Sequence, residues 1–331
     1  MDRPDIVIVT PALADANNGN WRTARRWARM LSAAYRVRVA AAWDGGEEAL
    51  MIALHARRSA TAVANWKTRR PAARLIVVLT GTDLYRDIVG DAAAQASLRS
   101  ADCLIVLNEL GVRALPLDLR FKARVVLQSC AARQTLAKTR SHLRALMVGH
   151  LRAEKSPRTY FDAARLLSHR PDILLDHVGA ALDPALGVEA SSLAAECPRY
   201  RWLGALAHAD TRKRIQSAHV LVHPSRMEGG AHVVIEAVCS GTPVLASRID
   251  GNVGLLGEGY DGYFPPGDAA ALATLLQQLR DDPAMLDRLH RQCDARAALF
   301  DPAHETAALH ALVGESLVSS SEPHLTHREP P

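Results

Sequence analysis

The chain has 331 residues, of which 48% are hydrophobic and 23% are charged, and this composition is typical of a globular protein. At about 150 residues per domain, the length predicts two domains. The net charge of +5 permits an anionic partner but selects none. With only 5% aromatic residues and no recognised binding motif, the sequence gives no support for nucleic-acid binding.

Cysteine spacing and hydropathy narrow the class further. The cysteines are dispersed and form no C-x-x-C pair, which argues against a disulfide framework and against a structural zinc site. No apolar run approaches the ~18 residues that a membrane-spanning helix needs. The start of the chain lacks the apolar region of a signal peptide. We therefore expect a cytoplasmic protein with no membrane span.

Short continuous apolar runs in the first part of the chain alternate with helical patterns. Runs of this length predict strands that are buried on both faces, as in a parallel sheet covered by helices. The expected strands are Asp5–Thr10, Val37–Ala42, Met51–His55, Leu75–Thr80, Cys103–Asn108 and Val125–Gln128. The pattern indicates an N-terminal α/β domain over residues 1–135, with a doubly wound, Rossmann-like sheet.

A second series of the same kind follows a polar segment, residues 131–141, that suits a linker. Its expected strands are Leu143–Gly149, Ile173–Gly179, Tyr200–Leu203, Val220–His223 and Pro243–Ser247. Helical patterns at about Ala269–Arg280 and Pro283–Phe300 complete a second Rossmann-like domain over residues 141–300. A last helix over residues 301–318 is expected to return to the first domain, and residues 319–331 are expected to be disordered. The two domains are predicted to face each other across a cleft at the carboxyl ends of their strands.

The first helix follows the first strand and carries two kinds of face. Its predicted core face consists of Trp21, Ala24, Trp27, Ala28 and Leu31. Arg25, Arg26 and Arg29 are equally consistent with a solvated basic face. Arg22 differs because it lies in the first turn, beside Asn20, where the helix dipole disfavours a cation unless an anion is bound.

Two strand ends in the first domain carry polar residues. In Leu54–Ser59 these are His55, Arg57 and Arg58, and in Leu79–Asp87 they include Thr80, Thr82 and Asp83. Because the arginines stand at the start of a helix, they favour an anion there. His55 taken alone is more often a core histidine with satisfied hydrogen bonds.

The segment Met147–Leu167 begins the second domain with a strand that ends at Gly149. A helix follows, with Ser156 expected as its N-cap and Pro157 at its first position. Lys155 places a positive charge just before that helix, which is unfavourable unless an anion binds. The alternative is a surface loop with ordinary charges.

The segment SRMEGGAHVVIEAVCSGTPV, residues 225–244, places two carboxylates eight positions apart. Glu228 stands before a helix predicted from about Ala231 to Ser240, and Glu236 lies inside it. Gly229 and Gly230 let an anion approach the backbone, since no Cβ stands in the way. The helix start adds free amides and a favourable dipole. The alternative is a solvated loop followed by an ordinary helix.

With Pro224 and Ser225 before it and Ser240-Gly-Thr-Pro-Val after it, this segment resembles the E-x7-E motif of family 4 glycosyltransferases, which have the GT-B fold. The resemblance implies that Glu228 contacts the transferred sugar and that Glu236 binds the ribose of a nucleoside diphosphate sugar. It also implies donor-binding roles for Gly19, which matches the family's glycine-rich loop at residues 17–20, and for Gly229. The amides of Gly230, Ala231 and His232 are expected at the diphosphate.

The same resemblance assigns the diphosphate cations. Lys155 matches a family lysine before the helix, whereas His150 stands where the family usually has an arginine. Arg152, two places on, is the other candidate for that role. The chain contains no D-x-D segment. We therefore expect no metal and no cofactor, with a UDP-sugar as co-substrate and Lys155, Arg152 and Glu228 as the catalytic residues.

Many family members place an acceptor-orienting histidine where this chain has Thr80. An alcohol acceptor benefits from a base, whereas an anionic acceptor needs cations. Arg22, Arg57 and Arg58 therefore favour an anionic acceptor in the first domain, which offers no obvious base. The full set of residues expected to bind the acceptor is Asn20, Arg22, His55, Arg57, Arg58, Thr80, Thr82 and Asp83.

The stretches ALHARRS, LTGTDLYRD, ADCLIVLNE and EGGAHVVIEA together resemble a specialised branch, the selenosugar synthases of selenoneine biosynthesis. That resemblance implies transfer of N-acetylglucosamine or glucose from a UDP-sugar to selenophosphate, with formation of a C–Se bond. Two alternatives stay open: a transferase with an alcohol acceptor, and a non-catalytic nucleotide-sugar-binding protein.

Overall fold

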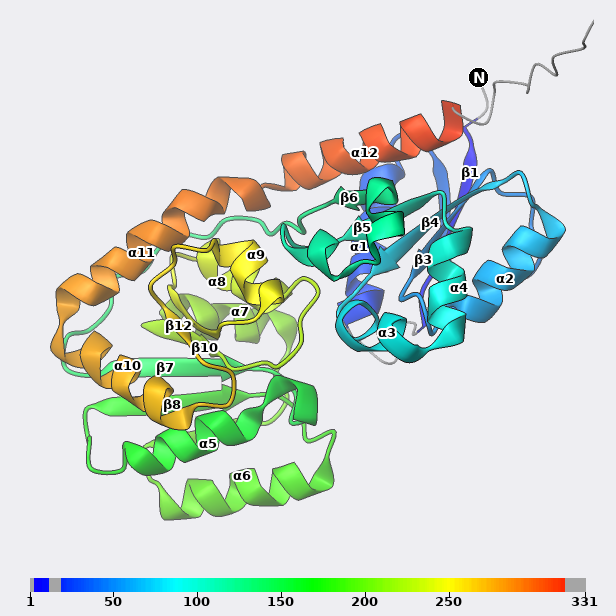
Figure 1. Cartoon of the computed structure of the whole chain (residues 1–331). Helices are drawn as coiled ribbons and strands as arrows, with labels where there is room; N and C mark the ends of the chain where they lie inside the picture. The colour runs from blue at the N-terminus through cyan, green and yellow to red at the C-terminus, as the bar shows by residue number, and fades with distance from the viewer. Residues whose placement is uncertain (1–2, 12–18, 319–331) are drawn as a thin grey trace, which may run out of the picture. The chain divides into compact units, whose positions relative to one another are not determined.

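The computed structural model describes residues 3–11 and 19–318 (Figure 1). The described chain divides into two compact units. Unit 1 is formed by residues 3–11, 19–107, 111–126 and 303–318, and unit 2 by residues 108–110 and 127–302. The domain boundaries predicted from the sequence at residues 135 and 141 stay predictions.

Unit 1 is built around a parallel six-stranded sheet in the order β2-β1-β3-β4-β5-β6. The strands are β1 (Asp5–Val9), β2 (Arg36–Ala40), β3 (Leu50–Leu54), β4 (Arg74–Leu79), β5 (Cys103–Val106) and β6 (Ala123–Val125). The helices are α1 (Gly19–Leu31), α2 (Ala60–Arg69), α3 (Ile88–Gly90), α4 (Ala92–Ser100) and α12 (Pro302–Val318). A π-helical turn, η2 (Asp83–Asp87), precedes α3.

Alternation along the strands explains why the strands of unit 1 read as continuous apolar runs. Ile6 and Ile8 of β1 belong to a core that includes α1 and α12, whereas Val7 and Val9 belong to a second core that includes α2 and α4. Successive side chains of a strand point to opposite faces, so helices on both faces require apolar residues at every position.

A buried carboxylate ties α12 to α1 within unit 1. Glu305 is 2% exposed, and its Oε1 accepts a hydrogen bond from Trp27 Nε1 at 2.6 Å. Arg26 pairs with the same oxygen at 3.1 Å. Because a buried carboxylate needs both hydrogen bonds and a counter-charge, these two partners of α1 fix the place of α12.

Unit 2 is built around a second parallel six-stranded sheet in the order β12-β11-β10-β7-β8-β9. The strands are β7 (Leu143–Val148), β8 (Ile173–Val178), β9 (Tyr200–Trp202), β10 (Val220–His223), β11 (Val244–Ser247) and β12 (Tyr263–Phe264). The helices are α5 (Pro157–Leu166), α6 (Pro184–Glu196), α7 (His208–Ser217), α8 (His232–Val238), α9 (Asp250–Leu256), α10 (Ala269–Asp281) and α11 (Pro283–Ala297). Helix α5 packs against α6 and α10, while α8 packs against α7, α9 and α11 (Figure 1).

The predicted fold class is confirmed: the chain is α/β, with two doubly wound, Rossmann-like parallel sheets. Two details were wrong. The sixth strand of unit 1 was expected at Val125–Gln128 but is Ala123–Val125, and the two-residue strand Tyr263–Phe264 was not predicted. A strand so short has too few residues for a periodic pattern. No described helix has the length and apolarity required for a membrane span.

Candidate functional site

The strand order of unit 2 defines where a ligand can bind. The chain starts at β7 and adds β8 and β9 on one side, then returns and adds β10, β11 and β12 on the other. Loops after β7 and β10 therefore leave the sheet in opposite directions, and a crevice opens at their carboxyl ends. Lys155 follows β7, and the loop with Glu228 follows β10. Both residues therefore lie at this topological switch point, where the strand order reverses.

Lys155 and Glu228 meet directly. Lys155 Nζ lies 2.5 Å from Glu228 Oε1, and both side chains are largely buried. His223, the last residue of β10, places its Nε2 3.3 Å from the same oxygen but outside hydrogen-bonding geometry. Burial alone would raise the pKa of Glu228, yet the charge of Lys155 and the nearby His223 hold it well below its usual range. Burial keeps the pKa of His223 below its ordinary value.

Glu236 is held by two histidines. Its Oε1 lies 2.6 Å from Nε2 of His208, the first residue of α7, and 3.3 Å from Nδ1 of His232, one turn earlier on α8. The guanidinium of Arg212 approaches the same oxygen at 3.9 Å. Although burial opposes ionisation, the hydrogen bonds from both histidines hold the pKa of Glu236 well below its usual range. The structure thus brings the predicted residues Glu236 and His232 together.

The loop between β10 and α8 is anchored at both ends. Asn108 Nδ2 donates to the carbonyl of Gly229 at 2.7 Å, and Ser247 Oγ donates to the carbonyl of Ser225 at 2.5 Å. The amide of Arg226 donates to the carbonyl of Glu154 at 2.8 Å. Gly251 packs so closely that a Cβ there would overlap the carbonyl oxygen of Glu228. These contacts fix the loop, with Gly229 buried and Gly230 partly exposed.

The predicted diphosphate amides lie between this loop and α8. In the described part of the chain, the amides of Gly230 and Ala231 donate to no acceptor, which leaves them available to an anion. Helix α8 spans seven residues, shorter than the helix from about Ala231 to Ser240 that the sequence predicted. Its dipole therefore contributes less than expected, and any anion site here rests mainly on the loop amides.

The other predicted cations of the donor site lie in the loop after β7. His150 accepts a hydrogen bond at Nδ1 from the amide of Ala180, at 3.0 Å. Arg152 is exposed and pairs with no carboxylate among the described residues. As predicted, Ser156 is the N-cap residue of α5 and Pro157 is its first residue, but the Ser156 side chain makes no capping bond: the residue has φ 48° and its Oγ contacts Thr159 Oγ1 at 3.0 Å.

In unit 1, the two predicted strand ends are joined through Asp83. This carboxylate is 0% exposed and accepts hydrogen bonds from the amides of Ala56, Thr80 and Gly81 at 2.8–3.0 Å. With its oxygens occupied by backbone amides, Asp83 ties the end of β3 to the end of β4. This environment does not fit the acceptor contact that the sequence predicted for Asp83.

His55 is buried, with a left-handed φ of 72°. Its Nε2 lies 3.1 Å from Thr82 Oγ1 and 3.9 Å from Asp87 Oδ2. Burial lowers its pKa, and the carboxylates of Asp83 and Asp87 oppose that effect. A histidine near a carboxylate is one arrangement that can serve as a base, so His55 is the candidate that unit 1 offers, and the expectation of a first domain without an obvious base stays a prediction.

The predicted arginines of unit 1 have different environments. Arg57 pairs with Asp91 at 2.9 Å and lies 3.8 Å from Asp87, so its charge is already compensated. Arg58 is exposed and pairs with no carboxylate among the described residues. Gly19 and Asn20 begin α1, and Arg22 is half-buried in its first turn. The rest of the predicted glycine-rich loop, including Asn17 and Asn18, lies outside the described residues.

Three residues of the candidate site were not selected from the sequence: Asn108, His208 and His223. Only His223 carried a usable signal, because it closes a strand at the carboxyl edge of the sheet. Asn108 and His208 reach the loop and Glu236 from elements distant in sequence. Among the residues that the structure describes, no group of His, Cys, Asp and Glu side chains is arranged as a set of metal ligands.

The sequence is similar to those of curated glycosyltransferases. The D-inositol 3-phosphate glycosyltransferase of Streptomyces avermitilis is 32% identical over 183 residues, which are 51% of this chain and 39% of that protein. The D-inositol 3-phosphate glycosyltransferase of an Arthrobacter species is 29% identical over 241 residues, which are 70% of this chain and 55% of that protein. The chain thus spans about 39–55% of the length of these curated relatives.

Solved structures with little sequence identity share the fold. A sucrose-phosphate synthase from Thermosynechococcus elongatus superposes with a TM-score of 0.77 at 18% identity, covering 96% of this chain and 100% of that one. Anabaena Alr3699/HepE, solved in complex with UDP and glucose, gives a TM-score of 0.72 at 17% identity with the same coverage. Residues 131–297, just over half of the chain, match the family described as glycosyl transferases group 1, and the chain belongs to that family.

Proposed function

We propose that the protein transfers a hexose, N-acetylglucosamine or glucose, from a UDP-sugar to an acceptor. The observation that carries this proposal is the pairing of Lys155 with Glu228 at the switch point of unit 2, with Glu236 anchored one loop away. A cation and two ionised carboxylates around a loop with free amides suit a ligand that combines a diphosphate with sugar hydroxyls.

In this proposal each group has a separate task. Glu236 accepts hydrogen bonds from the ribose hydroxyls, and Glu228 accepts them from the transferred sugar. Lys155 and the amides of Gly230 and Ala231 stabilise the negative charge that develops on the leaving UDP. Lys155 is held beside the site by Glu228 before the donor arrives, so little reorganisation is needed when the C–O bond breaks.

For the acceptor we propose selenophosphate. Its selenium would attack the anomeric carbon as the bond to UDP breaks, and the P–Se bond would then be cleaved by water to release phosphate. Support comes from the exposed cation Arg58, which lies two residues before α2. An anionic acceptor such as selenophosphate needs a cation of this kind to bind it. The compensation of Arg57 by Asp91 reduces the charge available for this role.

The second candidate is an alcohol acceptor. It is favoured by His55, whose Nε2 lies within 3.9 Å of Asp87, since this pair could take the proton of a hydroxyl. The relatives named as D-inositol 3-phosphate glycosyltransferases point to an alcohol that also bears a phosphate. Arg58 would serve such an acceptor equally well.

We further propose that the protein acts in the cytoplasm. The five cysteines, Cys103, Cys130, Cys197, Cys239 and Cys293, are all free thiols, as is usual in a reducing compartment.

The deciding experiment incubates the purified protein with UDP-N-acetylglucosamine and, in parallel, with UDP-glucose. Each donor is offered selenophosphate, D-inositol 3-phosphate or no acceptor, and UDP release and products are followed by mass spectrometry. Selenophosphate-dependent UDP release with a selenium-containing sugar supports the first candidate, and a glycosylated inositol phosphate supports the second. Donor binding without turnover would instead indicate a nucleotide-sugar-binding protein, and failure to bind UDP would refute the donor site.

A further inference from the structure

A separate cavity lies at the amino-terminal ends of the strands of the unit 2 sheet, away from the candidate donor site. It has a volume of about 300 Å³ and is bounded by the segment before β7, by the residues that precede β10 and β11, and by the turn between α10 and α11. These are the amino-terminal ends of the strands, whereas the candidate donor site lies at their carboxyl ends. The volume is within the range of small-molecule sites.

The irregular segment before β7 forms a fixed wall of this cavity. Gly241, with φ 63°, packs so closely on Thr135 that a Cβ there would overlap the threonine side chain. Gln216 Nε2 donates to the carbonyl of Gln134 at 2.6 Å, and His219 Nε2 contacts the carbonyl of Thr139 at 2.8 Å. The segment is therefore held in place by neighbouring parts of unit 2.

The polar part of the lining has a surplus of positive charge. Lys138, Arg140 and Arg280 line the cavity together with His142 and His290, while Asp287 is the carboxylate among the described lining residues. Arg280 is compensated by Asp172 at 2.7 Å. Lys138 and Arg140 pair with no carboxylate among the described residues.

Lys138 is the more informative of these two cations. It is half-buried, and its ammonium group donates to the carbonyl of Gln216. Burial lowers its pKa to about 8. A partly desolvated ammonium with only a carbonyl partner is less stable than one that faces an anion. His219 is part of the wall instead, because its Nδ1 accepts the amide of Arg144 and its Nε2 faces the carbonyl of Thr139.

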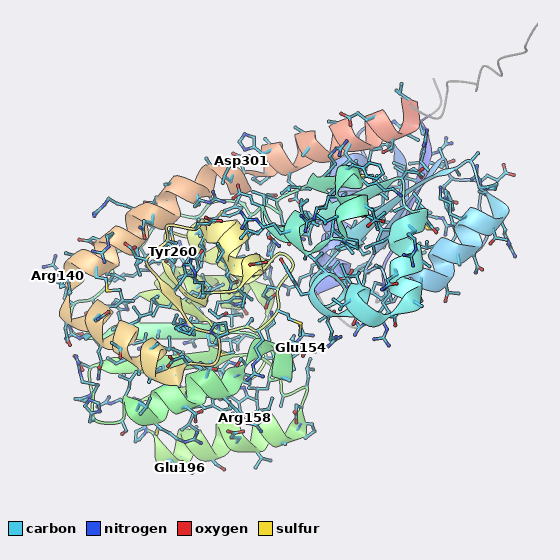
Figure 2. All side chains as sticks on the ribbon, viewed as in Figure 1. Arg140, Glu154, Arg158, Glu196, Tyr260 and Asp301 are labelled. Carbon is cyan, nitrogen blue, oxygen red and sulfur yellow. The ribbon has the colours of Figure 1, made fainter. Side chains whose placement is uncertain are left out.

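The rest of the lining is apolar. Leu136, Leu143, Leu279, Pro283 and Leu286 contribute to it. Leu136 is 38% exposed although it is a large hydrophobic residue. Leu143 and Leu279 are only 2% exposed, so a ligand would gain mainly by covering Leu136, Pro283 and Leu286, which solvent still reaches. Of the charged lining residues, Arg140, in the segment before β7, is labelled in Figure 2.

We propose that this cavity binds a small phosphate monoester whose organic part is apolar. The phosphate would lie against Lys138 and Arg140, and the organic part against Leu136, Pro283 and Leu286. A guanidinium and an ammonium together provide the donors that a dianionic phosphate accepts. The site is distinct from the donor site and does not depend on the transferase reaction proposed above.

The test is isothermal titration of the full-length protein with phenyl phosphate. Phenol, which lacks the charge, and inorganic phosphate, which lacks the apolar part, are the matched ligands and should each bind at least tenfold more weakly. Titration is repeated with saturating UDP, which should leave the affinity for phenyl phosphate unchanged. Lys138→Met and Arg140→Met should each weaken binding about tenfold, whereas Lys213→Met, outside the cavity lining, should not.

Several results would overturn the proposal: no binding of phenyl phosphate, equal binding of phenol, displacement by UDP, or undiminished binding by both variants. Melting temperatures show whether a variant has kept its fold. If Lys138→Met unfolds, Arg140→Met decides the outcome, since that side chain is exposed and supports no other group among the described residues.

Discussion

His208 Nε2 and Glu236 Oε1 lie 2.6 Å apart, which joins the first residue of α7 to a buried carboxylate of α8. His232 Nδ1 approaches the same oxygen at 3.3 Å. The carboxylate is therefore ionised and oriented before any ligand binds. A fixed acceptor of this kind can bind hydroxyl groups without having to lose side-chain freedom first.

The first prediction concerns donor binding. Glu236→Gln should weaken UDP binding about tenfold or more, because the bonds from ribose hydroxyls to a charged acceptor are stronger than those to an amide. Isothermal titration with UDP measures the change. Glu189→Gln is the control, since Glu189 pairs with Arg158 on the surface of unit 2. Equal UDP affinity in Glu236→Gln and the wild type would remove Glu236 from the ribose site.

The second prediction concerns acid stability. The pKa of Glu236 is depressed in the folded protein, so the folded state keeps this group ionised while the unfolded chain takes up a proton. Its contribution to stability is complete above about pH 4.5 and is lost as the pH falls further. The melting temperature of Glu236→Gln should therefore fall less steeply between about pH 5 and 3 than that of the wild type. Parallel curves would contradict this expectation.

The third prediction concerns the leaving group. Lys155→Met should lower kcat about 100-fold or more, with a smaller effect on the KM for the donor, since its charge acts mainly as UDP departs. The variant also leaves Glu228 without its cation and should melt at a lower temperature. Lys155→Met combined with Glu228→Gln removes that unpaired carboxylate and should recover stability but not turnover. Full turnover in Lys155→Met would exclude the role.

The fourth prediction concerns the loop that carries Glu228. Gly251→Ala should displace this loop, because the new methyl group would overlap the carbonyl oxygen of Glu228. We expect UDP binding to fall at least tenfold and stability to fall by about 1–3 kcal/mol. Gly259→Ala is the matched control, since a Cβ there meets no atom within 4 Å. If both variants bind UDP equally, the close packing at Gly251 does not position the site.

The fifth prediction concerns the acceptor. Arg58→Ala should raise the KM for an anionic acceptor about fivefold to tenfold and leave the KM for the UDP-sugar unchanged. Arg57→Ala should have the smaller effect, because Asp91 already compensates that charge. Steady-state kinetics with both substrates varied separates the two constants. A rise in the donor KM alone would show that unit 1 does not hold the acceptor through Arg58.

The outcome of the sequence predictions depended on how local each signal was. The runs at Asp5–Thr10 and Leu75–Thr80 were identified as strands because burial on both faces leaves a continuous apolar pattern in the sequence. The bounds of β6 were predicted wrongly and the strand Tyr263–Phe264 was not predicted, because strands of three and two residues show no periodic pattern in the sequence. The start of α5 was predicted correctly from Ser156 followed by Pro157, but the left-handed backbone of Ser156, which the sequence did not indicate, comes without the expected side-chain bond.

By itself, the sequence determined the α/β class and the two series of strands, and it singled out Lys155, Glu228 and Glu236. Only the tertiary structure decided that Lys155 pairs with Glu228, that His208 holds Glu236, and that Asp83 faces backbone amides instead of an acceptor. Periodicity and motif spacing reflect neighbours along the chain. Partners 28 or 73 positions apart meet only because the order of parallel strands brings their carboxyl ends to one edge.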